Sequence, residues 1–325
     1  MKLARRHFME LGASAVVFAV LSTPARTESY PTRPVRIIVG FPAGGLGDIA
    51  ARLVGQSLSE QLGQQFIVEN RPGAGTNIAT EAVVRAPADG YTLLLTTALN
   101  AINATVYNRL NFDFVRDIAP VGSIVDAAFV LEVNPSVPAK TVPEFIAYAK
   151  ANPGKLLMAS GGVGSPEHVA GELFKMMTGV DMLHVPYRGS APAVIDLVGG
   201  HAHLCFGPIA PSIEHIRAGS LRALAVTTAR RADALPNIPA LGDFLPGFEA
   251  SASLGLGAPT NTPTEVIDIL NKAINVALAD ENLEARFADL GMTVLPGSPG
   301  DFGNLIATDT EKWAKVVKFA GIHVD

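Results

Sequence analysis

The chain has 325 residues, of which 48% are hydrophobic and 17% are charged, with 31 glycines and 23 prolines. This composition excludes a disordered chain and fits one large or two medium-sized α/β domains. The formal net charge is −5 and the sequence contains no basic run, which argues against nucleic acid as a partner. Cys205 is the only cysteine, so an internal disulfide and a thiolate metal cluster are both excluded.

The first 25 residues have the features of an export signal. Arg5 and Arg6 precede an apolar segment, 11–21, which is too short to span a bilayer, and a small-residue cleavage site follows at 23–25. The paired arginines, with Phe8 and Met9 after them, resemble a twin-arginine signal, and an ordinary signal peptide is the alternative. We predict that residues 1–25 are removed on export to the periplasm and that the remaining chain is soluble.

The segment 35–53 combines a strand, a glycine-rich loop and the start of a helix. Residues 35–39 are apolar and β-branched, as in a strand that is buried on both faces. Residues 40–47 include four glycines, which leave backbone amides uncovered, and Asp48 opens a segment with helical apolar periodicity. Amide groups and the helix dipole can face an anion at such a junction. We therefore predict that this loop forms half of a binding site for a small carboxylate.

The elements that follow alternate between strands and helices, which indicates βαβ units and a parallel sheet. Strands are predicted at 65–69 and 91–97, and a helix at 77–85. Two apolar runs flank Asp126 between 121 and 133, and we interpret them as one strand that leaves the first sheet and another that enters a second. After a helix at 142–151 and a strand at 156–159 comes a second glycine loop, 160–164. Ser165 then caps a helix that has Pro166 at its first position and ends before Gly179.

The rest of the chain continues this pattern and closes with helices. Strands are predicted at 183–185, 204–206, 221–227, 251–257 and 293–295, and helices at 191–198, 212–218, 264–279, 282–290 and 299–318. We expect Trp313 to pack the last helix against the protein. The two glycine loops belong to separate βαβ series, which predicts two similar domains that face each other across a ligand cleft. Domain 1 is predicted to comprise 30–126 and 252–325, and domain 2, inserted into it, 127–251.

Several motifs occur in order along the chain and together resemble one family. They are 41–45 (FPAGG) with Asp48, 69–75 (ENRPGAG), 88–93 (ADGYTL), 159–168 (ASGGVGSPEH), 185–189 (VPYRG) and 258–263 (APTNTP). This set resembles the tripartite tricarboxylate transporter substrate-binding family, the Bug-type extracytoplasmic solute receptors. The resemblance covers nearly the whole chain after the export signal.

The resemblance implies an α/β periplasmic-binding-protein (Venus flytrap) fold, with a mostly parallel sheet flanked by helices in each domain. It implies a receptor and not an enzyme, with no cofactor or metal. The compact two-domain plan needs no partner chain to bury its core, so we expect a monomer. Such a receptor captures a di- or tricarboxylate or an aromatic acid and delivers it to integral-membrane permease subunits. The positions that match the ligand-binding residues of the family are Phe41, Gly44, Gly45, Asp48, Thr96, Thr97, Ala98, Asn100, Ser160, Gly162, Gly164, Ser165, His168, Tyr187, Arg188 and Gly189.

The chain departs from the family pattern after Gly200. Where the family usually has Gln-Val-Asp, this sequence has His201-Ala202-His203. If the acidic position senses a cationic group of the ligand, its replacement by His203 argues against an amino acid as ligand. A histidine would instead favour a second carboxylate or an aromatic ring. We therefore add His203 to the predicted ligand-binding residues.

Other functions fit parts of the sequence. Residues 45–50 match the dinucleotide fingerprint G-x-G-x-x-A of an NAD(P)-dependent oxidoreductase, but 41–44 intervene between the strand and that match. No G-x-S-x-G elbow marks a hydrolase, and a helix cap accounts for Ser165 beside His168. His201 and His203 could ligate a metal, but no carboxylate stands at ligand spacing nearby.

Two questions stay open at this point. Arg188 could bind a ligand carboxylate bidentately or could close the two domains through a salt bridge. The receptor could serve transport, or it could be an exported ligand sensor for a membrane signalling partner.

Overall fold

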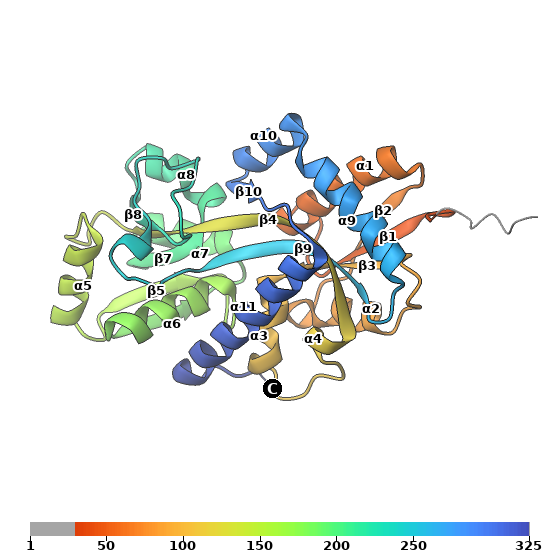
Figure 1. The fold of residues 1–325 in the computed structure, drawn as a ribbon. Helices are drawn as coiled ribbons and strands as arrows, with labels where there is room; N and C mark the ends of the chain where they lie inside the picture. The colour runs from red at the N-terminus through yellow and green to blue at the C-terminus, as the bar shows by residue number, and fades with distance from the viewer. Residues whose placement is uncertain (1–29, 325) are drawn as a thin grey trace, which may run out of the picture.

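The computed structural model describes residues 30–324, so the predicted export signal at 1–25 lies outside the described residues. Ten strands form one sheet, whose main path runs in the order β2-β1-β3-β9-β4-β7-β5-β6, while β8 and β10 pair with β4 beside this path. Helices lie over both faces of the sheet (Figure 1). The fold is therefore α/β, as the sequence predicts.

The first lobe is built on the parallel strands β1 (Val35–Val39), β2 (Phe66–Asn70) and β3 (Thr92–Thr97). β1 lies between the other two, and its apolar side chains Ile37 and Ile38 are almost completely buried on opposite faces. The helices of this lobe are α1 (Leu46–Leu62), α2 (Asn77–Val84), α3 (Ala98–Val106), α4 (Phe114–Asp117), α9 (Thr264–Leu278) and α10 (Glu281–Asp289), with a 3₁₀ turn at Ala74–Thr76.

The second lobe repeats this arrangement. Its parallel strands are β5 (Leu156–Ser160), β6 (Met182–Pro186) and β7 (Leu204–Pro208), and β8 (Arg222–Val226) lies antiparallel to β4. The helices are α5 (Val142–Ala151), α6 (Pro166–Thr178), α7 (Ser190–Val198) and α8 (Ile209–Arg217), with a 3₁₀ turn at Leu241–Asp243. Ser165 caps α6 and Pro166 occupies its first position, so the predicted start of this helix is confirmed.

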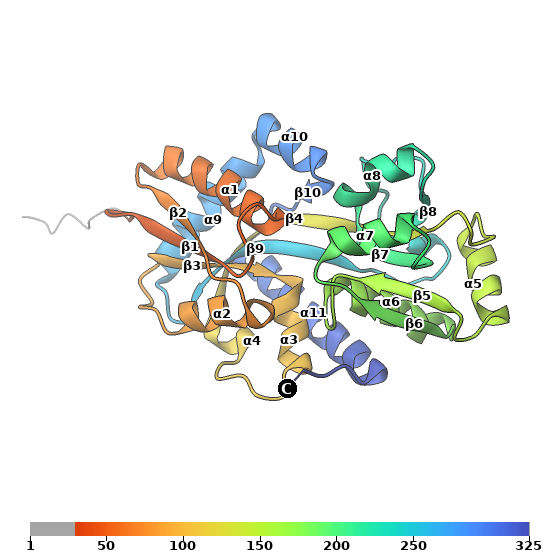
Figure 2. The same ribbon diagram turned by 180° about the vertical axis from the view of Figure 1, so that it is seen from behind.

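Two long antiparallel strands, β4 (Ile118–Val133) and β9 (Ser251–Pro259), join the lobes. Figure 2 shows α1 of the first lobe and α7 of the second towards opposite ends of this pair. β4 pairs with β9 as far as Ala128 and with β7 and β8 from Phe129 onward. The expected break into two strands at Asp126 is therefore wrong: a polar residue on one face of a strand does not end the ladder of backbone hydrogen bonds.

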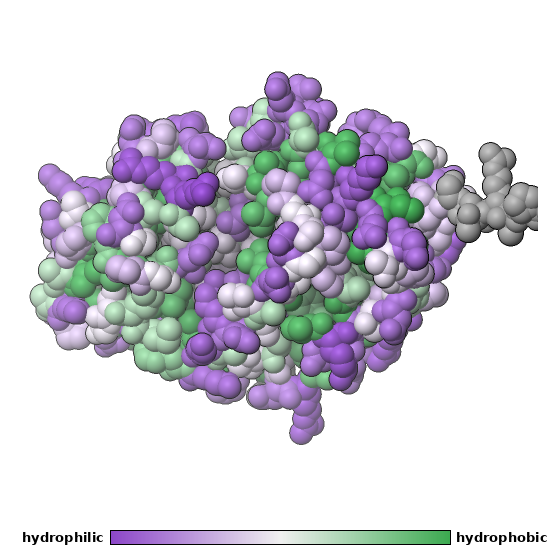
Figure 3. Space-filling model, viewed as in Figure 1, coloured by the Kyte–Doolittle hydropathy of each residue, from purple (hydrophilic) through white to green (hydrophobic). Residues whose placement is uncertain are grey.

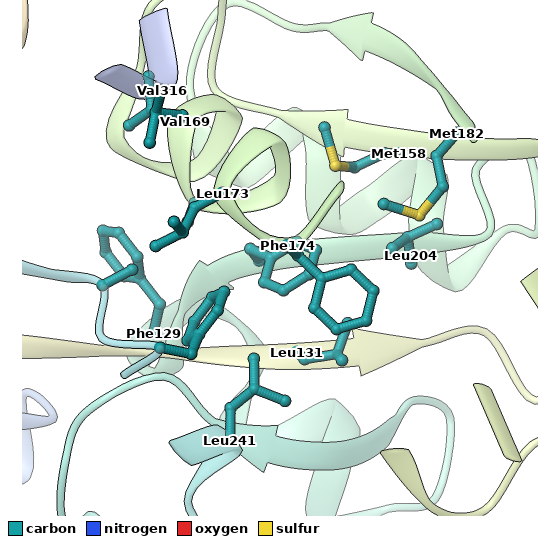
Figure 4. Packing of buried hydrophobic residues seen from close by; sticks show 14 of the residues in the cluster. Phe129, Leu131, Met158, Val169, Leu173, Phe174, Met182, Leu204, Leu241 and Val316 are labelled. Carbon is teal, nitrogen blue, oxygen red and sulfur yellow. The ribbon is translucent and has the colours of Figure 1, made fainter. Parts of the chain in front are cut away.

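The last helix, α11 (Pro299–Ala320), packs on both lobes, against α3 and α6. Trp313 is 1% exposed and belongs to the largest apolar cluster, which confirms that it packs this helix down. In the same cluster, Val316 of α11 lies beside Val169 of α6 (Figure 4). The C-terminal helix is therefore a third connection between the lobes.

Most of the predicted elements are present, with ends that shift by a few residues. β10 (Met292–Val294) pairs with β4, and β9 returns to β3 as expected. Helix α3, which directly follows β3, was missed by the sequence analysis. Hydrophilic residues alternate with smaller hydrophobic areas on the face shown in Figure 3. Within 30–324, none of the helices has the length and apolar character needed to cross a membrane.

Candidate functional site

A cavity of about 520 Å³ is lined by residues of both lobes and of the two strands that join them. This volume is typical of sites for small molecules. Its walls are rich in apolar and small side chains. The lining residues are Phe41, Pro42, Gly45, Leu46, Gly47, Thr97, Ala98, Leu99, Ala127, Phe129, Gly161, Ser165, Pro166, Glu167, Gly189, Ser190, Pro208, Ala252 and Leu254.

Five helix N-termini meet at this cavity. Each follows the carboxyl end of a parallel strand: α1 follows β1, α3 follows β3, α6 follows β5, α7 follows β6 and α8 follows β7. Their N-cap residues Gly45, Thr97, Ser165, Gly189 and Pro208 all line the cavity. The positive ends of five helix dipoles therefore face one small space, which favours a bound anion.

Three of these N-termini lack a side-chain cap. Thr97 and Ser165 accept hydrogen bonds from first-turn amides of α3 and α6, whereas Gly45, Gly189 and Pro208 provide no such bond. First-turn amides have no partner within their own helix, so α1, α7 and α8 can offer donors to a ligand. Lysine, arginine and histidine are absent from the described residues that line the cavity. Backbone amides are thus the main source of positive potential.

Asp48 holds the first glycine loop in place. Its carboxylate accepts hydrogen bonds from the Gly44 amide at 2.9 Å and from Asn70 at 2.8 Å, and it pairs with Arg52 at 2.9 Å. Burial alone would raise the pKa of Asp48, but the bonds from Arg52, Gly44 and Asn70 together lower it to about 2. Neither Gly44 nor Asp48 lines the cavity, and the hydrogen bond between them fixes the loop that leads to it.

The start of α3 is fixed by a buried polar network. Asn100 Oδ1 accepts a hydrogen bond from the Thr97 amide at 2.8 Å, and Asn100 Nδ2 donates to Thr80 Oγ1 at 2.8 Å. Thr97 and Ala98 line the cavity. Thr96 and Asn100 do not: Thr96 lines a separate small space beside α11, and its hydroxyl has no partner among the described residues.

A stacked histidine pair supports the second glycine loop. His168 and His184 lie face to face with ring centroids 3.5 Å apart, and His184 Nε2 is 2.6 Å from Ser160 Oγ. The Gly164 amide donates to His168 Nδ1, and the Gly162 amide donates to Ser160 Oγ, each at 3.1 Å. The predicted residues Ser160, Gly162, Gly164 and His168 are therefore joined by hydrogen bonds in and beside the second glycine loop, and none of them lines the cavity.

Both imidazoles of this pair are neutral near pH 7. Burial lowers the pKa of His168 to about 3, with further lowering by His184 and Lys175. Burial, followed by the charge of Lys175, lowers the pKa of His184 to about 4. The pair therefore supplies no positive charge to an anion in the cavity.

Three further predicted residues do not line the cavity. The Tyr187 hydroxyl donates to Asp196 at 2.8 Å. Arg188 is exposed, and it takes part in no ion pair among residues 30–324, so the salt bridge considered for it is absent there. His203 lies at the amino end of β7, where its Nδ1 accepts a hydrogen bond from the Leu157 amide at 2.9 Å. The cavity is at the opposite, carboxyl ends of these strands, so His203 has no contact with it.

The structure thus brings Phe41, Gly45, Thr97, Ala98, Ser165 and Gly189 together around one cavity. Their role in binding stays a prediction, as does that of the remaining predicted residues. Sequence analysis missed Glu167, Ser190 and Pro208. Glu167 was hidden because an acidic residue in the first turn of a helix is common for electrostatic reasons alone. Pro208 could have been found, because it ends an apolar strand directly before a helix.

The fold and the site define a two-lobed ligand-binding protein with an anion-favouring cavity at its centre. Known proteins share this fold along nearly the whole chain. A protein of R. palustris solved with adipate is 38% identical, with a TM-score of 0.79, over 90% of this chain and 99% of that one. MatC from Rhodopseudomonas palustris, solved with bound malate, is 29% identical, with a TM-score of 0.76, over 89% of this chain and 100% of that one.

Sequence relatives identify the family. The model of the tripartite tricarboxylate transporter family receptor matches residues 50–322. Protein BugT of Bordetella pertussis is 36% identical over 309 residues, which are 94% of this chain and 95% of BugT. The chain therefore belongs to the tripartite tricarboxylate transporter receptor family, and the resemblance of its motifs to Bug-type receptors is confirmed.

Proposed function

We propose that this protein is a periplasmic receptor that captures a small organic carboxylate between its lobes and delivers it to the membrane subunits of a tripartite tricarboxylate-type transporter. The convergence of five helix N-termini on a cavity whose described lining residues include no cationic side chain carries this proposal. The relatives solved with adipate and malate support it, because both ligands are carboxylates. The role of the family as transporter receptors supports the delivery step.

We propose capture without catalysis. The Ser160 and His184 pair resembles a nucleophile with its base, but Ser160 is 0% exposed and is absent from the cavity wall. A carboxylate would instead be held by charge-assisted hydrogen bonds from first-turn amides, while Phe41, Phe129 and Leu254 cover its apolar part. Closure of the lobes around the ligand would exclude water and strengthen these bonds.

A screen of ligands tests the proposal. The exported form, residues 26–325, is heated alone and with aliphatic and aromatic mono- and dicarboxylates, amino acids and nicotinamide cofactors. A ligand at 100 times its Kd adds about 2.7 kcal/mol of stability, which raises Tm by a few degrees in a protein of this size. We expect a selective shift with at least one carboxylate. A shift with a dinucleotide alone would overturn the proposal.

Two substitutions at one position give a matched control. Gly45 has φ −78° and ψ 165°, the conformation of an N-cap residue, and a Cβ there would meet only the Pro42 carbonyl at 3.6 Å. Gly45→Asp should cap α1 with its own carboxylate and so compete with the ligand, while preserving or raising stability. Gly45→Ala should leave the amides free. We expect carboxylate binding to fall at least about tenfold in G45D and to persist in G45A. Unchanged binding in G45D would show that α1 does not hold the carboxylate.

A further inference from the structure

Glu167 is the one charged side chain among the described residues that line the cavity. It is the second residue of α6 and is only 7% exposed. A buried carboxylate inside an anion-favouring cavity requires an explanation, because it repels the same ligands that the helix N-termini attract.

The carboxylate of Glu167 is held at the α6 and α7 side of the cavity. Its Oε1 accepts a hydrogen bond from Ser190 Oγ at 2.5 Å, and Ser190 is the first residue of α7. Both oxygens lie close to Gly161, where an added Cβ would come within 3.1 Å of Oε1 and 3.3 Å of Oε2. Gly161, Ser190 and Glu167 all line the cavity. The side chain is therefore fixed in the wall and is not a mobile surface group.

This carboxylate keeps unused capacity to accept hydrogen bonds. Among the ion pairs and side-chain hydrogen bonds of residues 30–324, the bond from Ser190 alone involves Glu167. An ionised carboxylate offers about four acceptor sites, so a donor from a ligand could be accommodated. The N-termini of α6 and α7 stabilise its negative charge without occupying those sites.

We propose that Glu167 sets the ligand class: a carboxylate whose other end carries a hydrogen-bond donor, such as an ammonium, amide or hydroxyl group. This inference rests on the proposed function. The carboxylate of the ligand binds at the uncapped N-terminus of α1, and its donor group binds Glu167 across the cavity. A second carboxylate at that end would face the charge of Glu167 and be disfavoured. From His203 we expected a ligand with a second carboxylate or an aromatic ring, and not an amino acid. His203 lies away from the cavity, and Glu167 favours the opposite ligand class.

Acids of equal length that differ only at the far end test this assignment. One series is 6-aminohexanoate, 6-hydroxyhexanoate, hexanoate and adipate. A second is 4-(aminomethyl)benzoate, 4-(hydroxymethyl)benzoate, 4-methylbenzoate and terephthalate. Affinities are measured by calorimetry for the wild-type protein and for Glu167→Gln. We expect the wild type to bind the amino or hydroxy acid at least about tenfold more tightly than the diacid of the same series. In E167Q this ratio should fall to about one or invert.

The control is Glu172→Gln, which makes the same chemical change on the same helix at a glutamate that does not line the cavity. E172Q should keep the wild-type ranking. If acids bind but the diacid is equal or preferred, or if E167Q leaves the ranking unchanged, the role of Glu167 is refuted and the receptor function stands. If neither these acids nor any carboxylate of the thermal screen binds the wild-type protein, the proposed function itself fails.

Discussion

Glu132 lies in β4 at the centre of the second lobe, and its side chain is completely buried. Oε1 accepts a hydrogen bond from Ser212 at 2.7 Å, while Oε2 has no partner among the described residues. Burial raises the pKa of Glu132 from 4.5 to about 8, and the bond from Ser212 offsets only part of this effect. The folded protein therefore holds a proton here that the unfolded chain loses near pH 4.5.

This difference makes stability depend on pH in a definite direction. Between pH 4.5 and about 8 the folded state binds one proton more than the unfolded state, so the free energy of unfolding falls as pH rises. The slope is about 1.4 kcal/mol per pH unit, which amounts to about 4 kcal/mol between pH 5 and pH 8. Glu132→Gln is neutral at every pH and should lack this contribution. Its stability relative to wild type should therefore grow by about 4 kcal/mol over the same interval.

Urea denaturation of both proteins at half-unit steps from pH 5 to pH 8 measures this gap. Taking the difference between the two curves cancels the contribution of every other titrating group. Ser212→Ala is the control, because it removes the hydrogen bond and keeps the titrating carboxyl, so its stability should still fall with pH. A gap between wild type and E132Q that stays constant within about 0.5 kcal/mol would refute the raised pKa of Glu132.

Asp48→Ala should lower the free energy of unfolding by about 2 kcal/mol at pH 7, because Gly44, Asn70 and Arg52 lose their acceptor. Urea titration measures this loss, and a value below about 0.5 kcal/mol would contradict the anchoring role of Asp48. Gly171→Ala should cost about 1–3 kcal/mol, because the added Cβ meets Met158 and Phe206 in the core. Gly300→Ala, near the start of α11, should be neutral or stabilising by the same assay. Folding lowers the pKa of His168 and His184 to about 3 and 4, so stability should be lost as pH falls from 6.5 towards these values. His184→Gln should reduce this loss of stability at low pH. An equal loss in H184Q and wild type, measured by urea titration, would contradict the prediction.

The sequence predicts the local elements of this fold well where one physical signal dominates. β1 and α1 follow from apolar runs and helical periodicity, and the start of α6 follows from a serine cap with proline after it. Asp126 interrupts two apolar runs, which suggests a break between two strands, yet the pairing partners on both sides keep β4 continuous. Helix α3 was missed, although the Thr97 and Asn100 pair that caps it is visible in the sequence.

The candidate site could be predicted only in part, because most of it arises from topology. Two of the five helix N-termini were recognised from glycine loops, but the other three follow strands without such a motif. Their meeting point depends on the order of strands in the sheet, which one sequence does not specify. Glu167 and His203 show the same limit. His203, which was expected at the ligand, lies at the amino end of β7. Glu167, which lines the cavity, resembles an ordinary first-turn acid in the sequence.

We propose that helix N-termini hold the carboxylate of the ligand. The most direct measurement is a crystal structure of the protein with the acid that raises Tm most in the screen. We predict that the carboxylate oxygens lie about 3 Å from first-turn amide nitrogens that line the cavity, at α1 in particular. A carboxylate paired instead with Arg188 or another cationic side chain, or bound outside the cavity, would contradict binding by helix N-termini.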